Sequence, residues 1–253
     1  MITFSLQSGS NGNCIYVEAG EVRLLFDAGI SGSTAEKRMY ERKRNIRDCD
    51  AVLISHDHCD HTACAGIFNR KYGLPLYMTP RVRAAIRPQL GKVSEIRQFL
   101  PGERIVIRDV TVHTLLTPHD GIDTVAFIVE HDGRRLGVMT DLGSPFKALA
   151  DAMETLDAAY LESNFDPHML RTGPYTESTQ RRIAGKGGHL SNEEAANLVF
   201  ACRSDRLKWV ATAHISECNN RPELAVDAHR NRIGAYFDVH IAGRHGVGPV
   251  LEV

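Results

Sequence analysis

Three histidines and two aspartates lie within six consecutive positions, His56 to His61, directly after the apolar run DAVLIS (50–55). The apolar run predicts a buried strand, so the polar residues would lie in the loop that leaves its end. Side chains in such a loop can converge on one point, and binding sites are often built there. Imidazole and carboxylate groups are ligands that Zn²⁺ and Mn²⁺ both accept. Titratable groups tolerate this crowding poorly without a cation, which favours a metal site over a solvated polar loop.

The rest of the sequence is typical of a globular protein. Its 253 residues suffice for one large α/β domain, 1–253, with a substantial core. The formal net charge of −1 excludes a global field that would attract nucleic acid or membranes. The N-terminus MITFSLQSGS has no basic region followed by an apolar run, and no segment approaches the roughly 18 apolar residues of a membrane span. The six cysteines include no Cys-x-x-Cys pair, so we expect reduced thiols and a cytoplasmic location.

The order of the predicted elements indicates the fold class. Short apolar or alternating runs separated by glycine turns predict strands in the first quarter and in the middle of the chain. A helix is predicted from Ser33, because Ser33 and Glu36 have the spacing of a capping box, to about Asn45. The same spacing predicts a helix that opens at Ser191, with Glu194 as its partner. Strands, helices, strands and helices in this order predict an αββα four-layer sandwich.

The His-x-His-x-Asp-His pattern of residues 56–61 resembles the signature of the metallo-β-lactamase superfamily. Further superfamily motifs follow in order, since LLFDAG, TPHD, MTDLG and ATAHIS resemble the first, third, fourth and last. The resemblance covers the whole chain and implies the metallo-β-lactamase fold with two divalent metal ions, Zn²⁺ or Mn²⁺. It implies that the first ion is held by His56, His58 and His119, and the second by Asp60, His61 and His214. It also implies that Asp141 bridges the two ions and that Asp27 supports the metal loop. Because the second motif position is His58 rather than Glu, the chain is similar to the hydrolytic branches and not to the di-iron branch.

Four further segments resemble the WalJ/YycJ-type subfamily, whose members are described as 5′-to-3′ DNA exonucleases: GSNGNCIYVE, LESNFDPHMLRTGPY, KGGHLSNEEA and AHISECNN. This resemblance implies phosphodiester hydrolysis, with a metal-bridging hydroxide attacking phosphorus and Asp60 essential for catalysis. Two cations about 3.5–4 Å apart suit that reaction, because they lower the pKa of a bridging water and stabilise the attacking and leaving oxygens. The chain departs from the pattern at Phe165, where relatives carry His, and no role is expected there.

The segment 167–190 supplies candidate substrate contacts. Its only acid is Glu177, whereas its basic residues are Arg171, Arg181, Arg182 and Lys186. Tyr175 could stack on a base or sugar of a nucleic acid. The alternative is a solvated helix face, which is the usual position of a run of charges.

His189, just before the predicted helix start at Ser191, is a candidate catalytic residue. An imidazole beside helix-start amides is placed to bind a phosphate oxygen and to protonate a leaving alkoxide. The alternative is a neighbour of the helix cap with no chemical role.

These features favour a DNA exonuclease, and two other functions stay open. One is a small-molecule metallohydrolase, such as a thioesterase, lactonase or cyclic phosphodiesterase, because the metal ligands do not select a substrate. The other is a metal-dependent nucleic-acid-binding or sensor module without catalysis.

Overall fold

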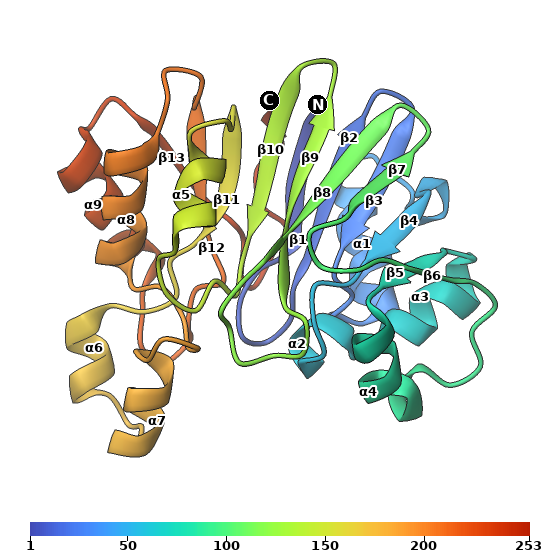
Figure 1. Ribbon diagram of the computed structural model, residues 1–253, viewed down its shortest axis with the longest axis horizontal. Helices are drawn as coiled ribbons and strands as arrows, with labels where there is room; N and C mark the ends of the chain where they lie inside the picture. The colour runs from blue at the N-terminus through green and yellow to red at the C-terminus, as the bar shows by residue number, and fades with distance from the viewer.

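Two sheets of seven strands each lie face to face in the computed structural model, which describes residues 1–253 (Figure 1). The first sheet has the order β14-β1-β2-β3-β4-β5-β6. Its strands are β1 (Ile2–Gln7), β2 (Cys14–Ala19), β3 (Val22–Phe26), β4 (Ala51–Leu53), β5 (Leu76–Met78), β6 (Ile96–Gln98) and β14 (Leu251–Glu252). The second sheet has the order β13-β12-β11-β10-β9-β8-β7. Its strands are β7 (Arg104–Ile107), β8 (Val110–Leu116), β9 (Val125–His131), β10 (Arg134–Met139), β11 (Ala158–Glu162), β12 (Trp209–Ala213) and β13 (Asp238–Ile241).

Helices cover the outer face of each sheet. The first sheet packs against α1 (Gly32–Glu41), α3 (Ala65–Tyr72) and α4 (Pro80–Leu90), and the second against α5 (Lys147–Met153), α8 (Asn192–Cys202) and α9 (Pro222–Ile233). The remaining helices are η1 (Ile46–Asp48), α2 (Cys59–Thr62), α6 (Pro167–Thr172) and α7 (Glu177–Ile183). The predicted αββα sandwich is therefore confirmed.

The alternation of side chains along β2 shows why the sequence forms this sandwich. Ile15 and Val17 pack in the core between the two sheets, whereas Cys14 and Tyr16 face the helices of the first sheet. Successive residues of a strand point to opposite faces, so a strand with helices on one side and a sheet on the other must be apolar on both. The two parallel strands β11 and β12 are buried along their whole length for the same reason.

The two predicted capping boxes had different outcomes. The box at Ser191 is confirmed, because both hydrogen bonds between Ser191 and Glu194 are present. The box at Ser33 is wrong: Ser31 is the N-cap of α1 and accepts from the amide of Thr34. Glu36 instead accepts a hydrogen bond from Lys71 Nζ at 2.7 Å. Ser31 has the extended backbone that a cap requires, and two candidate serines so close together cannot be separated by spacing alone.

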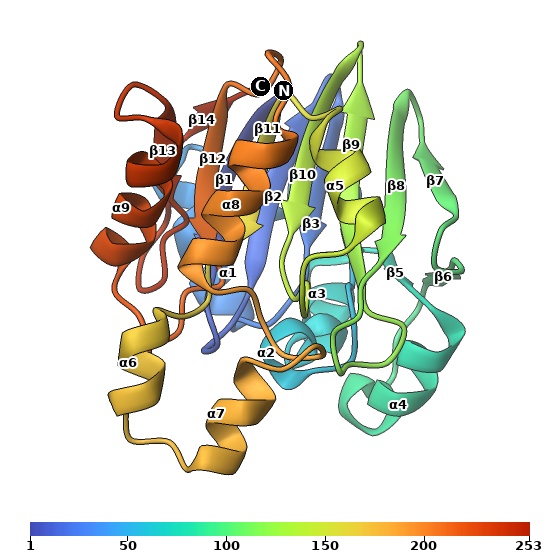
Figure 2. The ribbon, with the colours of Figure 1, turned by 60° about the vertical axis from the view of Figure 1, so that its left-hand side comes forward.

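Helices α6 and α7 project from the edge of the sandwich beyond the end of α8 (Figure 2). The sequence patterns do not predict α5, α6 or α7, because these helices are only six or seven residues long. No helix of the fold combines the length and the apolar character that a membrane crossing requires.

His229 of α9 makes the stability of the fold sensitive to acid. Its side chain is fully buried, Nε2 lies 3.2 Å from Ser163 Oγ, and Nδ1 has no hydrogen-bond partner. Burial lowers the pKa of His229 to about 4. The unfolded chain, with a histidine pKa of about 6.5, therefore binds the proton more tightly than the folded chain. The contribution of neutral His229 to the free energy of unfolding is complete above about pH 6.5. It is lost as the pH falls toward 4, which lowers that free energy by up to about 3 kcal/mol.

We therefore expect His229→Gln to flatten the pH dependence of the free energy of unfolding between pH 7 and pH 4.5. Urea titrations of both proteins at three pH values measure this slope. Identical slopes for the wild type and the variant would contradict the assignment.

Candidate metal centre

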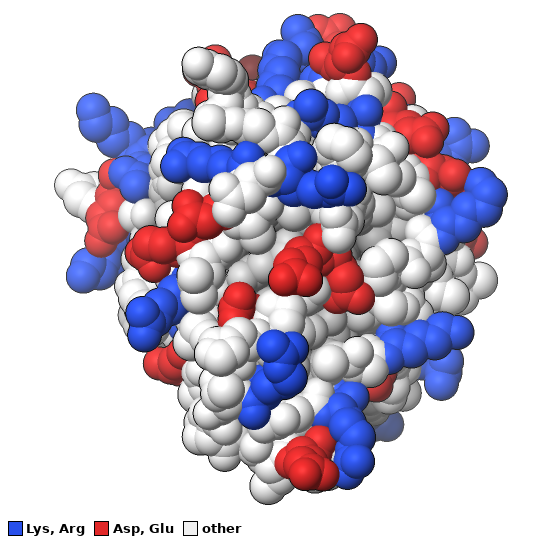
Figure 3. Space-filling model, turned by 90° about the vertical axis from the view of Figure 1, so that its left-hand side faces the viewer, with Lys and Arg blue, Asp and Glu red and all other residues white.

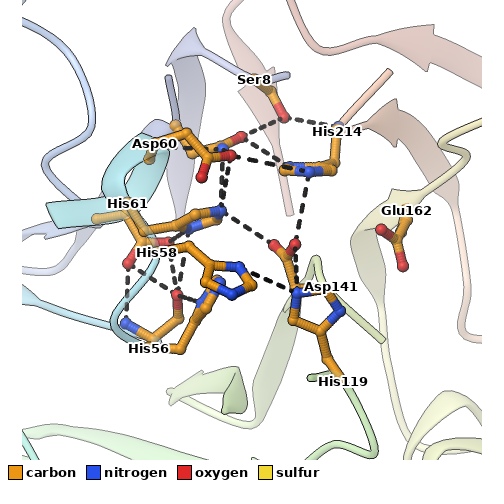
Figure 4. A network of polar contacts seen from close by, with 12 residues as sticks. Ser8, His56, His58, Asp60, His61, His119, Asp141, Glu162 and His214 are labelled. Carbon is orange, nitrogen blue, oxygen red and sulfur yellow. Dashed lines mark hydrogen bonds and ion pairs between the residues drawn. The ribbon is translucent and has the colours of Figure 1, made fainter. Parts of the chain in front are cut away.

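The predicted ligands meet at one edge of the sandwich, where strands of both sheets end (Figure 4). The motif His56–His61 follows β4, His119 follows β8, Asp141 follows β10 and His214 follows β12. Four groups of these side chains have potential ligand atoms within 4.8 Å of one another. They are His56, His58 and His119; Asp60, His61 and His214; His56, His61 and Asp141; and Asp141 and His214 with Glu162 and His189.

Three residues that shape the centre have a left-handed backbone. The φ angles of Asp27, Asp141 and His214 are 65°, 56° and 52°. Non-glycine residues adopt this region rarely, and such strain is concentrated at functional sites. Asp27 and His214 directly follow β3 and β12, so the turn in the backbone occurs where each strand delivers its side chain to the edge.

The histidine rings are oriented through hydrogen bonds at Nδ1. Nδ1 of His56 bonds to Ser55 Oγ at 2.9 Å, and Nδ1 of His61 bonds to Asp27 Oδ2 at 2.7 Å. Nδ1 of His119 bonds to the Gly188 carbonyl at 2.7 Å, and Nδ1 of His214 bonds to Asn13 Oδ1 at 3.2 Å. This arrangement leaves Nε2 of each ring for the centre. Such partners fix the tautomer and the direction of a ligand histidine. The predicted supporting position of Asp27 agrees with this geometry.

Asp141 lies between the two predicted halves of the centre. Its Oδ2 is 3.2 Å from His61 Nε2, and its Oδ1 is 3.4 Å from His214 Nε2 and 3.6 Å from His119 Nε2. On the first side, His58 Nδ1 lies 3.3 Å from His119 Nε2. On the second, Asp60 Oδ2 lies 3.4 Å from His61 Nε2 and 4.0 Å from His214 Nε2. One carboxylate thus faces histidines from three different strand ends.

The donor set fits a divalent cation. His56 Nε2 and Asp141 Oδ2 are buried without a hydrogen-bond partner, which a folded protein rarely tolerates. Burial, together with the neighbouring His61, lowers the pKa of His56 well below its ordinary value. Burial raises the pKa of Asp141, but the charges of His214 and His61 more than offset this and hold that pKa well below its ordinary value. A neutral imidazole and an ionised carboxylate are the forms that bind metal.

Glu162 is a residue that the sequence prediction missed. Its side chain is fully buried, and Oε1 accepts a hydrogen bond from His189 Nδ1 at 2.6 Å. Oε2 accepts from the amides of Leu142 and Leu190 at 2.9 and 3.3 Å. The sequence did contain a signal for Glu162, because this residue stands at the end of the apolar run AAYLE. The predicted ligand His214 likewise follows an apolar strand.

His189 lies beside the predicted ligands. Its ring stacks on that of His214 at 5.2 Å between centroids and is tilted against that of His119 at 4.9 Å. Burial lowers its pKa, but the carboxylate of Glu162 more than offsets this, so that the pKa of His189 is raised. Because Nδ1 is bonded to Glu162, Nε2 is the nitrogen left to face a substrate.

Asn13 is a second residue at the centre that lies outside the predicted ligand set. Its Nδ2 is 3.0 Å from His61 Nε2 and 3.3 Å from Asp60 Oδ2, and its Oδ1 faces His214. It comes from the turn SGSNGN, which joins β1 to β2 at the same edge. Asn13 therefore links the motif loop to the residue after β12.

The basic residues of the segment 167–190 are placed unequally. Arg182 Nε donates to Asp120 Oδ2 at 2.8 Å, next to His119, a predicted ligand. Arg181 lies 3.7 Å from Glu177, and both line a shallow pocket with Arg171. Tyr175 and Lys186 are exposed. Figure 3 shows positive and negative side chains interspersed over the face that carries α6 to α9, with no continuous basic surface. Only Arg182, among the predicted substrate contacts, is joined to the metal centre.

Comparison with known proteins agrees with this fold and site. The family model described as the beta-lactamase superfamily domain matches residues 22–210. The chain belongs to this superfamily. Over 244 residues it is 32% identical to the exodeoxyribonuclease YycJ of Bacillus anthracis, covering 93% of this chain and 92% of the relative. Over 259 residues it is 34% identical to the exodeoxyribonuclease WalJ of Streptococcus pneumoniae, covering 98% and 96%.

The fold is also that of a solved structure. The metallo-β-lactamase fold protein YhfI of Bacillus subtilis superimposes with a TM-score of 0.75 at 16% identity, covering 99% of each chain. The predicted fold and the resemblance to WalJ/YycJ-type proteins are confirmed, and the chain is a hydrolase of the metallo-β-lactamase superfamily.

Proposed function

We propose that the chain, acting as one domain over residues 1–253, is a two-metal phosphodiesterase that degrades DNA from the 5′ end. The observation that carries the proposal is the pair of His189 and buried Glu162, whose 2.6 Å hydrogen bond places an imidazole against the ligands His119 and His214. An acid in this position suits a poor leaving group such as the alkoxide of a sugar. DNA as the substrate comes from the similarity to the exodeoxyribonucleases WalJ and YycJ. The 5′-to-3′ direction rests on the sequence resemblance to the WalJ/YycJ-type subfamily alone.

The ligand set would hold two divalent ions, Zn²⁺ or Mn²⁺, with His56, His58 and His119 on one side, Asp60, His61 and His214 on the other, and Asp141 between them. Ions bound there would polarise the phosphate and lower the pKa of a water nucleophile. Asp27, Ser55 and Asn13 hold the rings in place through Nδ1. His189 donates a proton from Nε2 to the leaving oxygen, while Glu162 keeps Nδ1 bonded and the ring aligned.

The projecting helices α6 and α7 would hold the nucleic acid. Arg171, Arg181, Arg182 and Lys186 would contact backbone phosphates, and Tyr175 would stack on a base. These contacts are few, so the salt dependence of binding should be modest and proportional to the number of phosphates held. A small-molecule hydrolase would not need this exposed basic arm. The cytoplasmic location stays a prediction.

The test is a length-ladder assay of DNA labelled at the 5′ or the 3′ end, with Zn²⁺ or Mn²⁺ added and the bound metal measured. We expect stepwise shortening from the 5′ end. The same preparation is offered a thioester and bis-p-nitrophenyl phosphate. Fast thioester turnover without DNA cleavage would favour the small-molecule hydrolase, and metal-dependent DNA binding without any turnover would favour the sensor.

Asp60→Asn separates catalysis from DNA binding in this assay. We expect the variant to lose activity and to retain oligonucleotide affinity, because Asp60 faces His61 and His214 and not the basic arm. Asp109→Asn is the matched control, since Asp109 lies in the turn between β7 and β8 and pairs with His131. Equal activity of the wild type and Asp60→Asn would remove Asp60 from the proposed site.

A further inference from the structure

Asp120, the residue after His119, has a carboxylate that touches two parts of the protein at once. Its Oδ1 lies 3.4 Å from His119 Nε2 and 3.8 Å from His58 Nε2. Its Oδ2 accepts the hydrogen bond from Arg182 Nε at 2.8 Å. One third of the Asp120 side chain is exposed, at 33%. The carboxylate therefore stands between the first group of ligands and α7.

The backbone around Asp120 is bonded to the same segment. The amide of Asp120 donates to the Gly187 carbonyl at 2.9 Å, and His119 Nδ1 bonds to the Gly188 carbonyl at 2.7 Å. The packing leaves no room for a side chain at Gly143, where an added Cβ would lie 2.7 Å from the Lys186 carbonyl oxygen and 3.0 Å from the His119 amide. Residues 182–188 thus pack against the turn that contains His119.

The pair of Asp120 and Arg182 could be an ordinary surface ion pair, which contributes little to stability. Two observations argue against that interpretation. Asp120 Oδ1, which is 3.4 Å from His119 Nε2, also lies 3.8 Å from His58 Nε2. This is the nitrogen of His58 that is turned away from His119, because His58 Nδ1 faces His119. A carboxylate against the outer nitrogen of a ligand histidine orients the ring and raises its basicity, and loss of such a partner typically lowers metal affinity by about 10- to 100-fold. Arg182 is also the one predicted substrate contact that reaches the centre.

We propose that Asp120 is a positioning residue that joins the first half of the metal centre to α7. The charge on Oδ1 orients the ring of His58, and the hydrogen bond at Oδ2 keeps Arg182 beside the site. Only the contact of Arg182 with a substrate phosphate rests on the proposed function. The effect on metal binding and on α7 is independent of the substrate.

Four variants separate the two roles. Asp120→Ala removes both contacts, Asp120→Asn keeps an oxygen for His58 but loses the charge, and Arg182→Ala removes only the arginine. Arg206→Ala is the matched control, because Arg206 also pairs with an aspartate, Asp157, but that aspartate precedes β11, at the strand end opposite to Glu162. Thermal unfolding of the metal-free proteins checks that each variant folds.

Titration of the metal-free proteins with Zn²⁺ measures the first role. We expect Asp120→Ala to weaken the binding of one ion by about 10- to 100-fold and Asp120→Asn to weaken it less. Arg182→Ala and Arg206→Ala should stay within about twofold of the wild type, as for an exposed ion pair. Wild-type affinity for both ions in Asp120→Ala would overturn the assignment of Asp120 to His58.

Hydrogen exchange of the peptide 177–189 measures the second role. Exchange should become faster in Asp120→Ala, Asp120→Asn and Arg182→Ala and stay unchanged in Arg206→Ala. Unchanged exchange in the first three variants would overturn the link to α7. With DNA, Arg182→Ala should raise KM by about 10- to 100-fold at constant kcat, as for one charged hydrogen bond. If the wild type cleaves no DNA, the proposed function fails, while the titration and the exchange still decide the role of Asp120.

Discussion

Replacing Asp141 with alanine is expected to lower kcat/KM for DNA by roughly 1,000-fold or more, about 4 kcal/mol of transition-state stabilisation. Asp141 is the only carboxylate that faces His61, His119 and His214, and its Oδ2 is buried without a hydrogen-bond partner. Without it, neither half of the centre has its full donor set. Metal analysis of the purified variant should therefore show the loss of at least one ion per chain.

The control for this experiment is Asp151→Ala. Asp151 is exposed on α5, pairs with Lys147 and lies on the helical layer of the second sheet. Its metal content and activity should equal those of the wild type. An Asp141→Ala protein that retained two ions and normal turnover would show that the bridging assignment is wrong.

Replacing His189 with alanine is expected to lower kcat for DNA by roughly 100- to 10,000-fold, the usual contribution of a positioned acid. The metal content should not change, because His119 and His214 keep their own Nδ1 partners, Gly188 and Asn13. The decisive readout is the leaving group. The p-nitrophenolate of bis-p-nitrophenyl phosphate leaves as a stable anion and needs no proton, so its hydrolysis should be affected far less than that of DNA.

Glu162→Gln tests the support of His189 in the same assay. The amide keeps the size of the side chain but removes the charge that faces His189 Nδ1, so it should lower kcat for DNA less than His189→Ala does. A loss of equal size on both substrates in His189→Ala would instead indicate that His189 holds the ligands in place, and the acid role would be withdrawn.

The sequence predicted the parts of the site that depend on local spacing. Residues 56–61 carry their ligand types within six positions, and the strand before them fixes the edge to which they are delivered. The capping box of Ser191 and Glu194 was likewise predicted, because both partners lie within one helical turn. The false box at Ser33 shows the limit of this reasoning, since Ser31 has an equal claim by residue type.

The contacts that complete the site could not be predicted in this way. Glu162 and His189 are 27 residues apart, and Asp120 and Arg182 are 62 apart. Each pair meets because β8, β11 and the segment before α8 end at the same edge, which is a property of the strand order and not of either segment alone. The sequence also could not rank the basic residues of the segment 167–190. Their composition makes Arg171, Arg181, Arg182 and Lys186 equal candidates for substrate contacts, yet only Arg182 reaches the centre.

By itself, then, the sequence determined the layers of the fold through periodicity and capping, and its resemblance to the metallo-β-lactamase superfamily predicted the set of metal ligands. Only the tertiary structure decided which side chains besides Asp27 lie against those residues and which arginine stands beside them. The physical reason is that hydrogen bonds and ion pairs act over about 3–4 Å, and residues far apart in the chain come within that distance only after the two sheets have packed.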